Sequence, residues 1–280
     1  MTVVDLPITS VAPTARLRAT RSSAFAALLL RDLTVLRKNL KEFIPRTILQ
    51  PLLLVFVFTY VFPKIGQGVG GSGAAAATFS SVLVAGVVAT AILFQGIQAV
   101  ALPLVQEFGY TREIEDRVLA PLPVKMVGFE KIVAGALQCL VAGLIVFPIA
   151  AVVPATDVHL DINWAIVLTL IPIGCIMSGA LGLMFGTMFN PRSVPMLFAV
   201  VLIPITFLGC TYYSWQALEA IRWLQIAVLL NPLVYLSEGF RGALTPVPHM
   251  NLFAVYGVLI GATVLFTYVG LRGFAKRVID

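Results

Sequence analysis

The charged residues best placed to act together form a block in the middle of the chain. The block lies in the stretch EFGYTREIEDRVLAPLPVKMVGFEK over 107–131 and comprises Thr111, Arg112, Glu113, Glu115, Asp116 and Arg117. It suits one or two helical turns, which Pro121 and Pro123 then stop because proline has no N–H to donate. Such side chains can make ionic contacts, so the block predicts a short helix at a membrane surface. A solvated loop that only joins two membrane spans is the alternative.

Two acid–base pairs follow near the C-terminal end of the chain, within 214–251. They are Glu219 with Arg222 and Glu238 with Arg241. A spacing of three residues lets each pair meet on one helix face. Asn231 and Pro232 separate the two helical pieces that we expect, about 215–230 and 233–244. Ionisable groups near a membrane are costly and often functional, although both pairs could simply neutralise helices in the head-group region.

No residue pattern in the sequence supports catalysis or a metal site. The phosphate-binding loop G-x-x-x-x-G-K-[ST] is absent, so the chain cannot hydrolyse ATP by the usual route. The metal motif H-E-x-x-H and the nucleophile motif G-x-S-x-G are absent too, which argues against a membrane-embedded enzyme. Cys139, Cys175 and Cys210 lie in apolar runs and are expected to be core residues. We therefore expect no catalytic residue, no metal and no cofactor in this chain.

The composition predicts an all-α membrane protein. Hydrophobic residues make up 59% of the chain and charged residues only 11%, whereas soluble domains carry about 25% charged residues. A spanning helix needs about 20 apolar residues. Six apolar stretches meet that requirement, at about 46–63, 78–105, 127–153, 164–189, 194–213 and 252–271. The polar loop over 107–126 and a re-entrant hairpin over 214–250, on the outer side, complete a six-span domain over 45–280.

The first 44 residues divide into a tail and an amphipathic helix. Residues 1–21 are polar, and we expect a disordered cytoplasmic tail. Over 22–44, apolar residues recur at spacings of four and three, along one helix face: Leu29, Leu33, Leu36, Leu40 and Phe43. Cations fall mostly on the other side: Arg31, Arg37, Lys38 and Lys41. A basic amphipathic helix lies in the interface of the lipid bilayer, and Pro45 is expected to end it.

The positions of the cations predict the orientation. With both termini, the loop over 107–131 and Arg192 on one side, that side holds 16 of the 19 Lys and Arg residues. Lys64, Arg222 and Arg241 fall on the other side. The positive-inside rule makes the crowded side cytoplasmic. The same distribution accounts for the net charge of +6 without nucleic acid as a partner.

Two local sequences resemble one family. NPLVYLSEGFRGAL over 231–244 and REIEDRVLAPLPVKMVGFEKIVAGAL over 112–137 resemble the membrane permeases of second-type ATP-binding cassette (ABC) exporters, which export drugs, polysaccharides or nodulation factors. The resemblance implies a dimer with a second copy or a paralogous permease in the bacterial inner (plasma) membrane. It also implies a cytosolic ABC ATPase, which binds ATP and Mg. That ATPase would bind the loop over 107–126 as a coupling helix, through the six residues of the charged block.

The resemblance also implies a transport pathway between the two permeases. Opposing faces of the second and fifth spans would line it, which suggests Phe94, Gln95, Gln98, Phe207, Thr211 and Tyr212. The re-entrant motif would comprise Asn231, Pro232, Glu238 and Arg241. The apolar spans favour an amphipathic drug, lipid or glycolipid-like substrate, with a polysaccharide as the alternative. An ion-coupled transporter or channel is disfavoured because the spans carry no Asp or Glu well inside, with Glu130 lying where a helix begins.

Overall fold

The computed structural model describes residues 20–65, 74–111, 113–119, 121–152, 161–189, 196 and 198–279. Within these ranges the regular structure is helical throughout, without a strand. The long helices are α1 (Arg21–Lys38), α2 (Leu40–Phe56), α4 (Ala74–Gln106), α6 (Val124–Val152), α7 (Trp164–Met188) and α12 (Leu252–Ile279). The shorter ones are η1 (Val57–Val61), α3 (Phe62–Lys64), η2 (Glu107–Thr111), α5 (Glu113–Val118), η4 (Phe198–Leu202), α9 (Ile203–Phe207), η5 (Trp215–Ala220), α10 (Arg222–Ala227), η6 (Val228–Leu230) and α11 (Pro232–Leu244).

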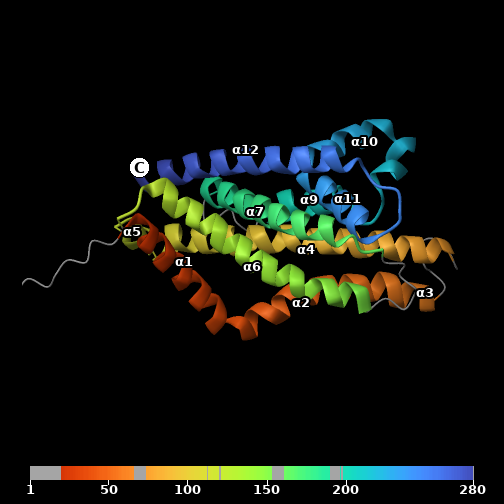
Figure 1. The fold of residues 1–280 in the computed structure, drawn as a ribbon, viewed down its shortest axis with the longest axis horizontal. Helices are drawn as coiled ribbons and strands as arrows, with labels where there is room; N and C mark the ends of the chain where they lie inside the picture. The colour runs from red at the N-terminus through yellow and green to blue at the C-terminus, as the bar shows by residue number, and fades with distance from the viewer. Residues whose placement is uncertain are drawn as a thin grey trace, which may run out of the picture.

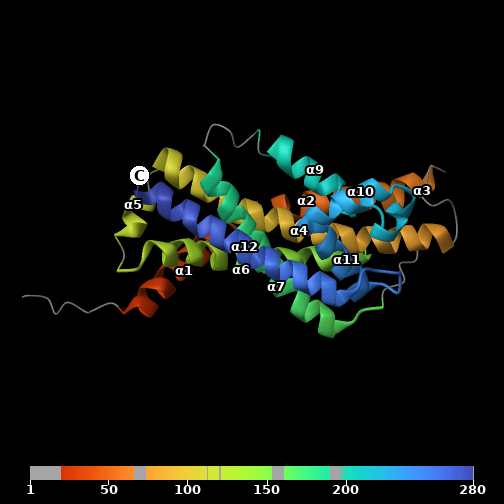
Figure 2. The ribbon, with the colours of Figure 1, turned by 90° about the horizontal axis from the view of Figure 1, so that it is seen from above.

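Helices α2, α4, α6, α7 and α12 run side by side along the long axis of the molecule, whereas α1 lies oblique to it (Figure 1). Helices α1 and α5 and the end of α12 lie at one end, and α3 and α10 lie at the other, in both views (Figures 1 and 2). We name these the α5 end and the α10 end. Helix α4 is central: it packs against α2, α6, α7 and α11, and every residue over 80–90 is buried. A helix this apolar on all sides belongs in the middle of a bundle.

Five helical stretches of the described chain are long and apolar enough to cross a membrane. They are Leu40–Lys64, Ala77–Gly109, Val124–Pro148, Trp164–Met188 and Leu252–Val278. The predicted span over 194–213 is not confirmed. Its described part is two short helices, η4 and α9, and the chain then turns at 208–213, where Cys210 has a φ of 53°. Residues 190–195 and 197 lie outside the described residues.

The N-terminal helix ends earlier than the sequence predicts. Instead of one helix over 22–44, the chain breaks at Asn39, whose N–H bonds the carbonyls of Val35 and Leu36. Helix α2 then continues through Pro45 and Pro51. Pro45 does not stop it, because helices in apolar bundles tolerate proline where neighbouring groups compensate for the lost hydrogen bond. The two-faced pattern holds only within α1, where the predicted leucines are half-buried and the predicted cations are exposed, because Leu40, Lys41 and Phe43 belong to α2.

Prolines lie inside four of the five spanning helices. They are Pro45 and Pro51 in α2, Pro103 in α4, Pro148 in α6 and Pro172 in α7. Helix α12 has none over its 28 residues. Each internal proline removes one backbone hydrogen bond from its helix.

Gly86 provides the closest approach between α4 and the turn over 208–213. A Cβ atom at this position would lie 2.2 Å from the Thr211 carbonyl oxygen, which is backbone and cannot rotate away. We therefore expect Gly86→Ala to destabilise the protein by about 1–3 kcal/mol, the usual cost of overpacking. Thermal unfolding in detergent measures the change. Gly261→Ala in α12 is the matched control, because nothing lies within 4 Å of its Cβ position; an equal effect of both substitutions would contradict the prediction.

Candidate functional site

A cluster of four charged side chains is buried at the α5 end. It comprises Asp32 of α1, Glu107 of η2, Arg117 of α5 and Lys131 of α6, which we name the charge cluster. The Arg117 guanidinium lies 3.0 Å from the Asp32 carboxylate and 2.9 Å from that of Glu107. The Lys131 ammonium lies 3.2 and 2.7 Å from the same two carboxylates. Two acids and two bases thus balance in a site where every side chain is at most 12% exposed.

The cluster joins four elements that are distant in sequence. Burial alone would raise the pKa of Asp32, but the charges of Lys131 and Arg117 outweigh it and lower that pKa below its ordinary value. Burial alone would lower the pKa of Arg117, but Glu107 and Asp32 raise it overall. Glu130 is also fully buried, and neither of its carboxylate oxygens has a hydrogen-bond partner among the described residues. Ion pairs that are poorly solvated therefore hold α5 to α1 and η2, and Lys131 of α6 binds the same two carboxylates.

The charged block predicted from the sequence is only partly a surface. Glu113 is half-exposed and pairs with Arg31 at 2.8 Å, whereas Arg117 is only 5% exposed and points into the charge cluster. Thr111 ends η2, Glu115 and Asp116 lie in α5, and Arg112 falls outside the described residues. Arg117 therefore anchors α5 through buried ion pairs with Asp32 and Glu107, and its charge is not exposed to a partner protein.

The sequence pattern did not indicate the other three members of the cluster. Asp32 carried a signal, since it is the only acidic residue within α1. Glu107 and Lys131 lie at the two ends of the polar stretch, but nothing in their spacing indicated a shared partner. Their contacts follow from helix packing, which joins residues up to 99 positions apart.

A second buried pair, Glu238 and Arg241 of α11, lies toward the α10 end. Both side chains are fully buried, and an Arg241 nitrogen donates to Glu238 Oε1. Glu238 Oε1 also accepts from the Trp215 N–H at 2.8 Å, and Oε2 accepts from the Met250 N–H at 2.9 Å. The carboxylate therefore joins η5 and the segment before α12 to α11.

The arginine of this pair holds the turn over 208–213. Arg241 Nη2 donates to the Cys210 carbonyl at 3.0 Å and to the Tyr213 carbonyl at 3.3 Å. Asn231 caps α11 by accepting from the Leu233 N–H, and its amide donates to the Ile205 carbonyl at 2.7 Å. The predicted motif of Asn231, Pro232, Glu238 and Arg241 thus spans α11 and positions the chain after α9.

Glu219 and Arg222 do not form the pair that the sequence suggested. Both are exposed, and no ion pair joins them in the part of the chain that the structure describes. Glu219 lies in the 3-10 helix η5, and Arg222 begins α10. Ile221, with a φ of −127°, interrupts the helix between them, so the three-residue spacing no longer places them on one face.

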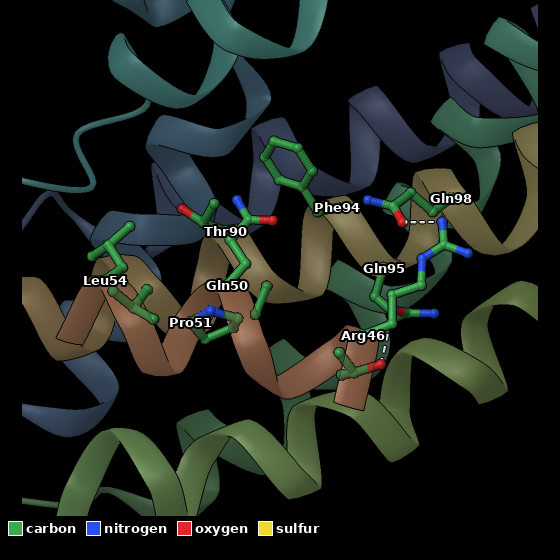
Figure 3. A pocket seen from close by; sticks show the side chains of 11 residues that line it. Arg46, Gln50, Pro51, Leu54, Thr90, Phe94, Gln95 and Gln98 are labelled. Atoms are coloured by element: carbon green, nitrogen blue, oxygen red, sulfur yellow. Dashed lines mark hydrogen bonds between the residues drawn. The ribbon is translucent and has the colours of Figure 1, made fainter. Parts of the chain in front are cut away.

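A crevice between α2 and α4 contains three of the predicted pathway residues (Figure 3). It is lined by Arg46, Thr47, Gln50, Pro51, Leu54, Val87, Thr90, Ala91, Phe94, Gln95 and Gln98. Arg46 donates to the Gln98 side-chain oxygen at 2.5 Å, and the Thr47 hydroxyl donates to that of Gln95 at 3.3 Å. The crevice therefore combines amide and hydroxyl groups with an apolar wall and one cation.

The other predicted pathway residues lie beyond the crevice. Thr211 is buried, and its hydroxyl lies 2.9 Å from that of Thr90, a lining residue. The Tyr212 ring centroid lies 5.9 Å from that of Phe207 and 5.7 Å from that of Phe58. The structure thus brings Thr211 to the crevice wall, while Phe207 and Tyr212 form a separate aromatic group.

A larger hollow of about 630 Å³ connects the crevice with the charge cluster. It lies between α1, α2, α4 and α6, and its lining includes all four cluster residues. Arg46, Gln95 and Gln98 line both spaces. Its volume lies within the range of about 300–1,000 Å³ typical of small-molecule sites. Within the described residues, no three His, Cys, Asp or Glu side chains are placed to hold a metal ion.

Comparison with known proteins gives matches over most of the chain. A family model described as ABC-2 type transporter matches residues 23–245. The inner membrane transport permease YadH of Escherichia coli (strain K12) is 26% identical over 231 residues, which cover 79% of this chain and 84% of that protein. YadH of Shigella flexneri matches with the same identity and coverage. No solved structure matches the chain.

Proposed function

Because the chain belongs to the ABC-2 type transporter family as a membrane permease, we propose that it exports an amphipathic drug, lipid or glycolipid-like substrate. As the transport subunit of an ABC transporter in the inner membrane, it is not itself the ATPase and works with an ABC ATPase subunit. ATP and Mg bind that partner. The observation that carries the proposal is the match of the family model to residues 23–245.

We propose that the α5 end is cytoplasmic and that α5 is the coupling helix. The excess of cations near α1, α5 and the end of α12 supports this orientation, with both termini inside. Glu113 on α5 pairs with Arg31 at 2.8 Å but stays half-exposed, so the ATPase can reach it, and Thr111, Arg112, Glu115 and Asp116 complete the proposed contact. Movement of α5 would reach α1 and α6 through the charge cluster, because ion pairs tie these helices together.

The crevice supports an amphipathic substrate better than a polysaccharide. Its wall of Leu54, Val87, Ala91 and Phe94 is apolar and suits a hydrocarbon chain, whereas a polysaccharide needs aromatic platforms and many hydrogen-bonding groups. We propose that the pathway continues past Thr211 toward Phe207 and Tyr212. A second copy of the chain, or a paralogous permease, would form its other side.

Purification of the tagged chain from solubilised membranes tests the proposal. We expect an ATPase subunit to be recovered in equal amount, with vanadate-sensitive ATP hydrolysis in the eluate. Glu113→Lys should reduce that recovery, because it reverses an exposed charge on the proposed coupling helix. Glu219→Lys, at an exposed position in η5, is the matched control and should not. A wild-type chain that purifies alone would contradict the proposal and favour a secondary transporter or channel.

A further inference from the structure

The charge distribution in the crevice indicates what kind of molecule it binds. Arg46 is the one charged side chain among the described residues that line it. We propose that the crevice binds an anionic amphipath, such as an alkyl phosphate or alkyl carboxylate, and that Arg46 recognises the anionic head group. This inference rests on the proposed function, because it names the chemical class of the exported substrate.

Arg46 has hydrogen-bonding capacity beyond its contact with Gln98. A guanidinium group carries five N–H donors in a planar fork, and Gln98 accepts from one nitrogen, Nη2. Glu42, one helical turn earlier on α2, forms no ion pair with Arg46 within the described ranges. The fork matches the paired oxygens of a carboxylate or phosphate, and such bonds are among the strongest that proteins make. An anion at this position would therefore have a permanent, correctly shaped cation to bind.

The surroundings of Arg46 favour an anion over a neutral or cationic head group. The side-chain NH₂ groups of Gln50 and Gln95 can donate further hydrogen bonds to anionic oxygens, whereas the Thr47 hydroxyl already donates to Gln95. Arg46 is exposed, so its guanidinium is accessible to an anionic ligand that enters the crevice. A cationic head group would meet repulsion from Arg46, and an uncharged one would leave the cation without its counter-ion.

The opposite part of the crevice is suited to a hydrocarbon chain. Leu54 and Pro51 face Val87 and Phe94 from the neighbouring helix, and Ala91 completes the wall. Figure 3 shows Arg46 and Gln98 at one end of the crevice, with Leu54 toward the other. The crevice has a volume of only about 40 Å³, so an amphipath would place its anionic head at Arg46 and only part of its tail along this apolar wall.

The larger hollow does not itself select by charge. Among the described residues, four cations and four acids line it and balance: Arg31, Arg46, Arg117 and Lys131 against Asp32, Glu42, Glu107 and Glu113. Because this hollow shares Arg46 with the crevice, a ligand can reach Arg46 from it. Discrimination by charge is therefore expected inside the crevice, where Arg46 is the one charged residue among the described lining residues.

Binding of matched probes to the full chain in phosphatidylcholine nanodiscs tests the inference. Dodecyl phosphate, monolaurin and dodecyltrimethylammonium share a tail of similar length and differ in head-group charge. We expect dodecyl phosphate to bind about tenfold more tightly than either of the others, the gain typical of a charged hydrogen bond. Equal affinities for dodecyl phosphate and monolaurin in the wild-type chain would overturn the inference.

Three variants separate recognition by Arg46 from a general effect on folding. Arg46→Gln should remove the preference for dodecyl phosphate, and Arg46→Lys should retain part of it. Gln98→Glu should also remove it, because a carboxylate beside Arg46 would replace the ligand anion while the arginine stays in place. Arg37→Gln, at an exposed position of α1 outside both hollows, is the matched control. Unchanged preference in Arg46→Gln would overturn the assignment.

Two further measurements identify the source of the ligand and distinguish a failure of this inference from a failure of the proposed coupling to an ATPase. Competition by phosphatidylglycerol in the nanodisc would support a membrane phospholipid as the anionic ligand, whereas dodecyl phosphate binding without competition would support a soluble amphipath. The amount of ATPase subunit that co-purifies with the chain is measured in the same preparation. Its recovery without a preference for anions overturns this inference alone, while a preference for anions without an ATPase contradicts the proposed coupling alone.

Discussion

Arg117→Gln is expected to lower the free energy of unfolding by about 3–5 kcal/mol and to reduce transport strongly. The substitution leaves the Asp32 and Glu107 carboxylates in a buried site, with Lys131 as their one remaining ion-pair partner among the described residues. Removing one member of a buried ionic group costs this much because the others stay charged and desolvated. Thermal unfolding in detergent and transport by reconstituted vesicles measure the two effects.

The neighbouring ion pair of α1 and α5 supplies the control for this prediction. Arg31 and Glu113 are also 2.8 Å apart, but their side chains are 46% and 45% exposed. Exposed pairs contribute at most about 1 kcal/mol, so Arg31→Gln should change the stability little. Similar losses of stability in Arg31→Gln and Arg117→Gln would show that burial of the charge cluster does not determine how much it stabilises the protein.

Glu238→Gln, toward the α10 end of the bundle, is expected to lower the free energy of unfolding by a similar amount, about 3–5 kcal/mol. The two Glu238 oxygens accept from Arg241 and from the backbone N–H groups of Trp215 and Met250. Glutamine has only one acceptor oxygen, so its NH₂ group would face one of these donors. The Arg241 charge would also remain buried without its counter-ion. Thermal unfolding of the purified variant checks the loss of stability.

A double substitution distinguishes a specific ion pair from a general packing effect. Glu238→Gln combined with Arg241→Met removes both charges. The double variant should therefore lose less stability than the sum of the losses in the two single variants. Glu219→Gln is the control, because Glu219 is exposed and outside this network. Additive losses in the double variant would mean that the two side chains do not stabilise each other.

The sequence predicts the apolar helices well, because hydropathy and length determine them. The span expected over 164–189 is α7, Trp164–Met188, and the span over 78–105 lies within α4, Ala74–Gln106. Hydropathy and length do not determine the break at Asn39. Both Asn39 and Pro45 could have ended the N-terminal helix, and the packing of α2 against α4 and α6 decides between them.

The sites are predicted less completely, because they depend on contacts between distant segments. Glu238 and Arg241 were recognisable from their spacing on one helix, yet their backbone partners in three other segments were not. The crevice shows the same limit: Phe94, Gln95 and Gln98 were identified, but Arg46 was not. Arg46 becomes a neighbour of Gln98 only when α2 packs on α4, since 52 residues separate them in the chain.

The distribution of prolines suggests how the bundle divides mechanically. Helix α12, with 28 proline-free residues at about 1.5 Å each, is about 42 Å of uninterrupted helix and should act as a stiff strut. The prolines inside α2, α4, α6 and α7 are points where a helix bends at low cost. A push on the α5 end would then flex these four helices about their prolines while α12 keeps its shape. The bundle would thus deform asymmetrically, with its hinged side opening away from its rigid side.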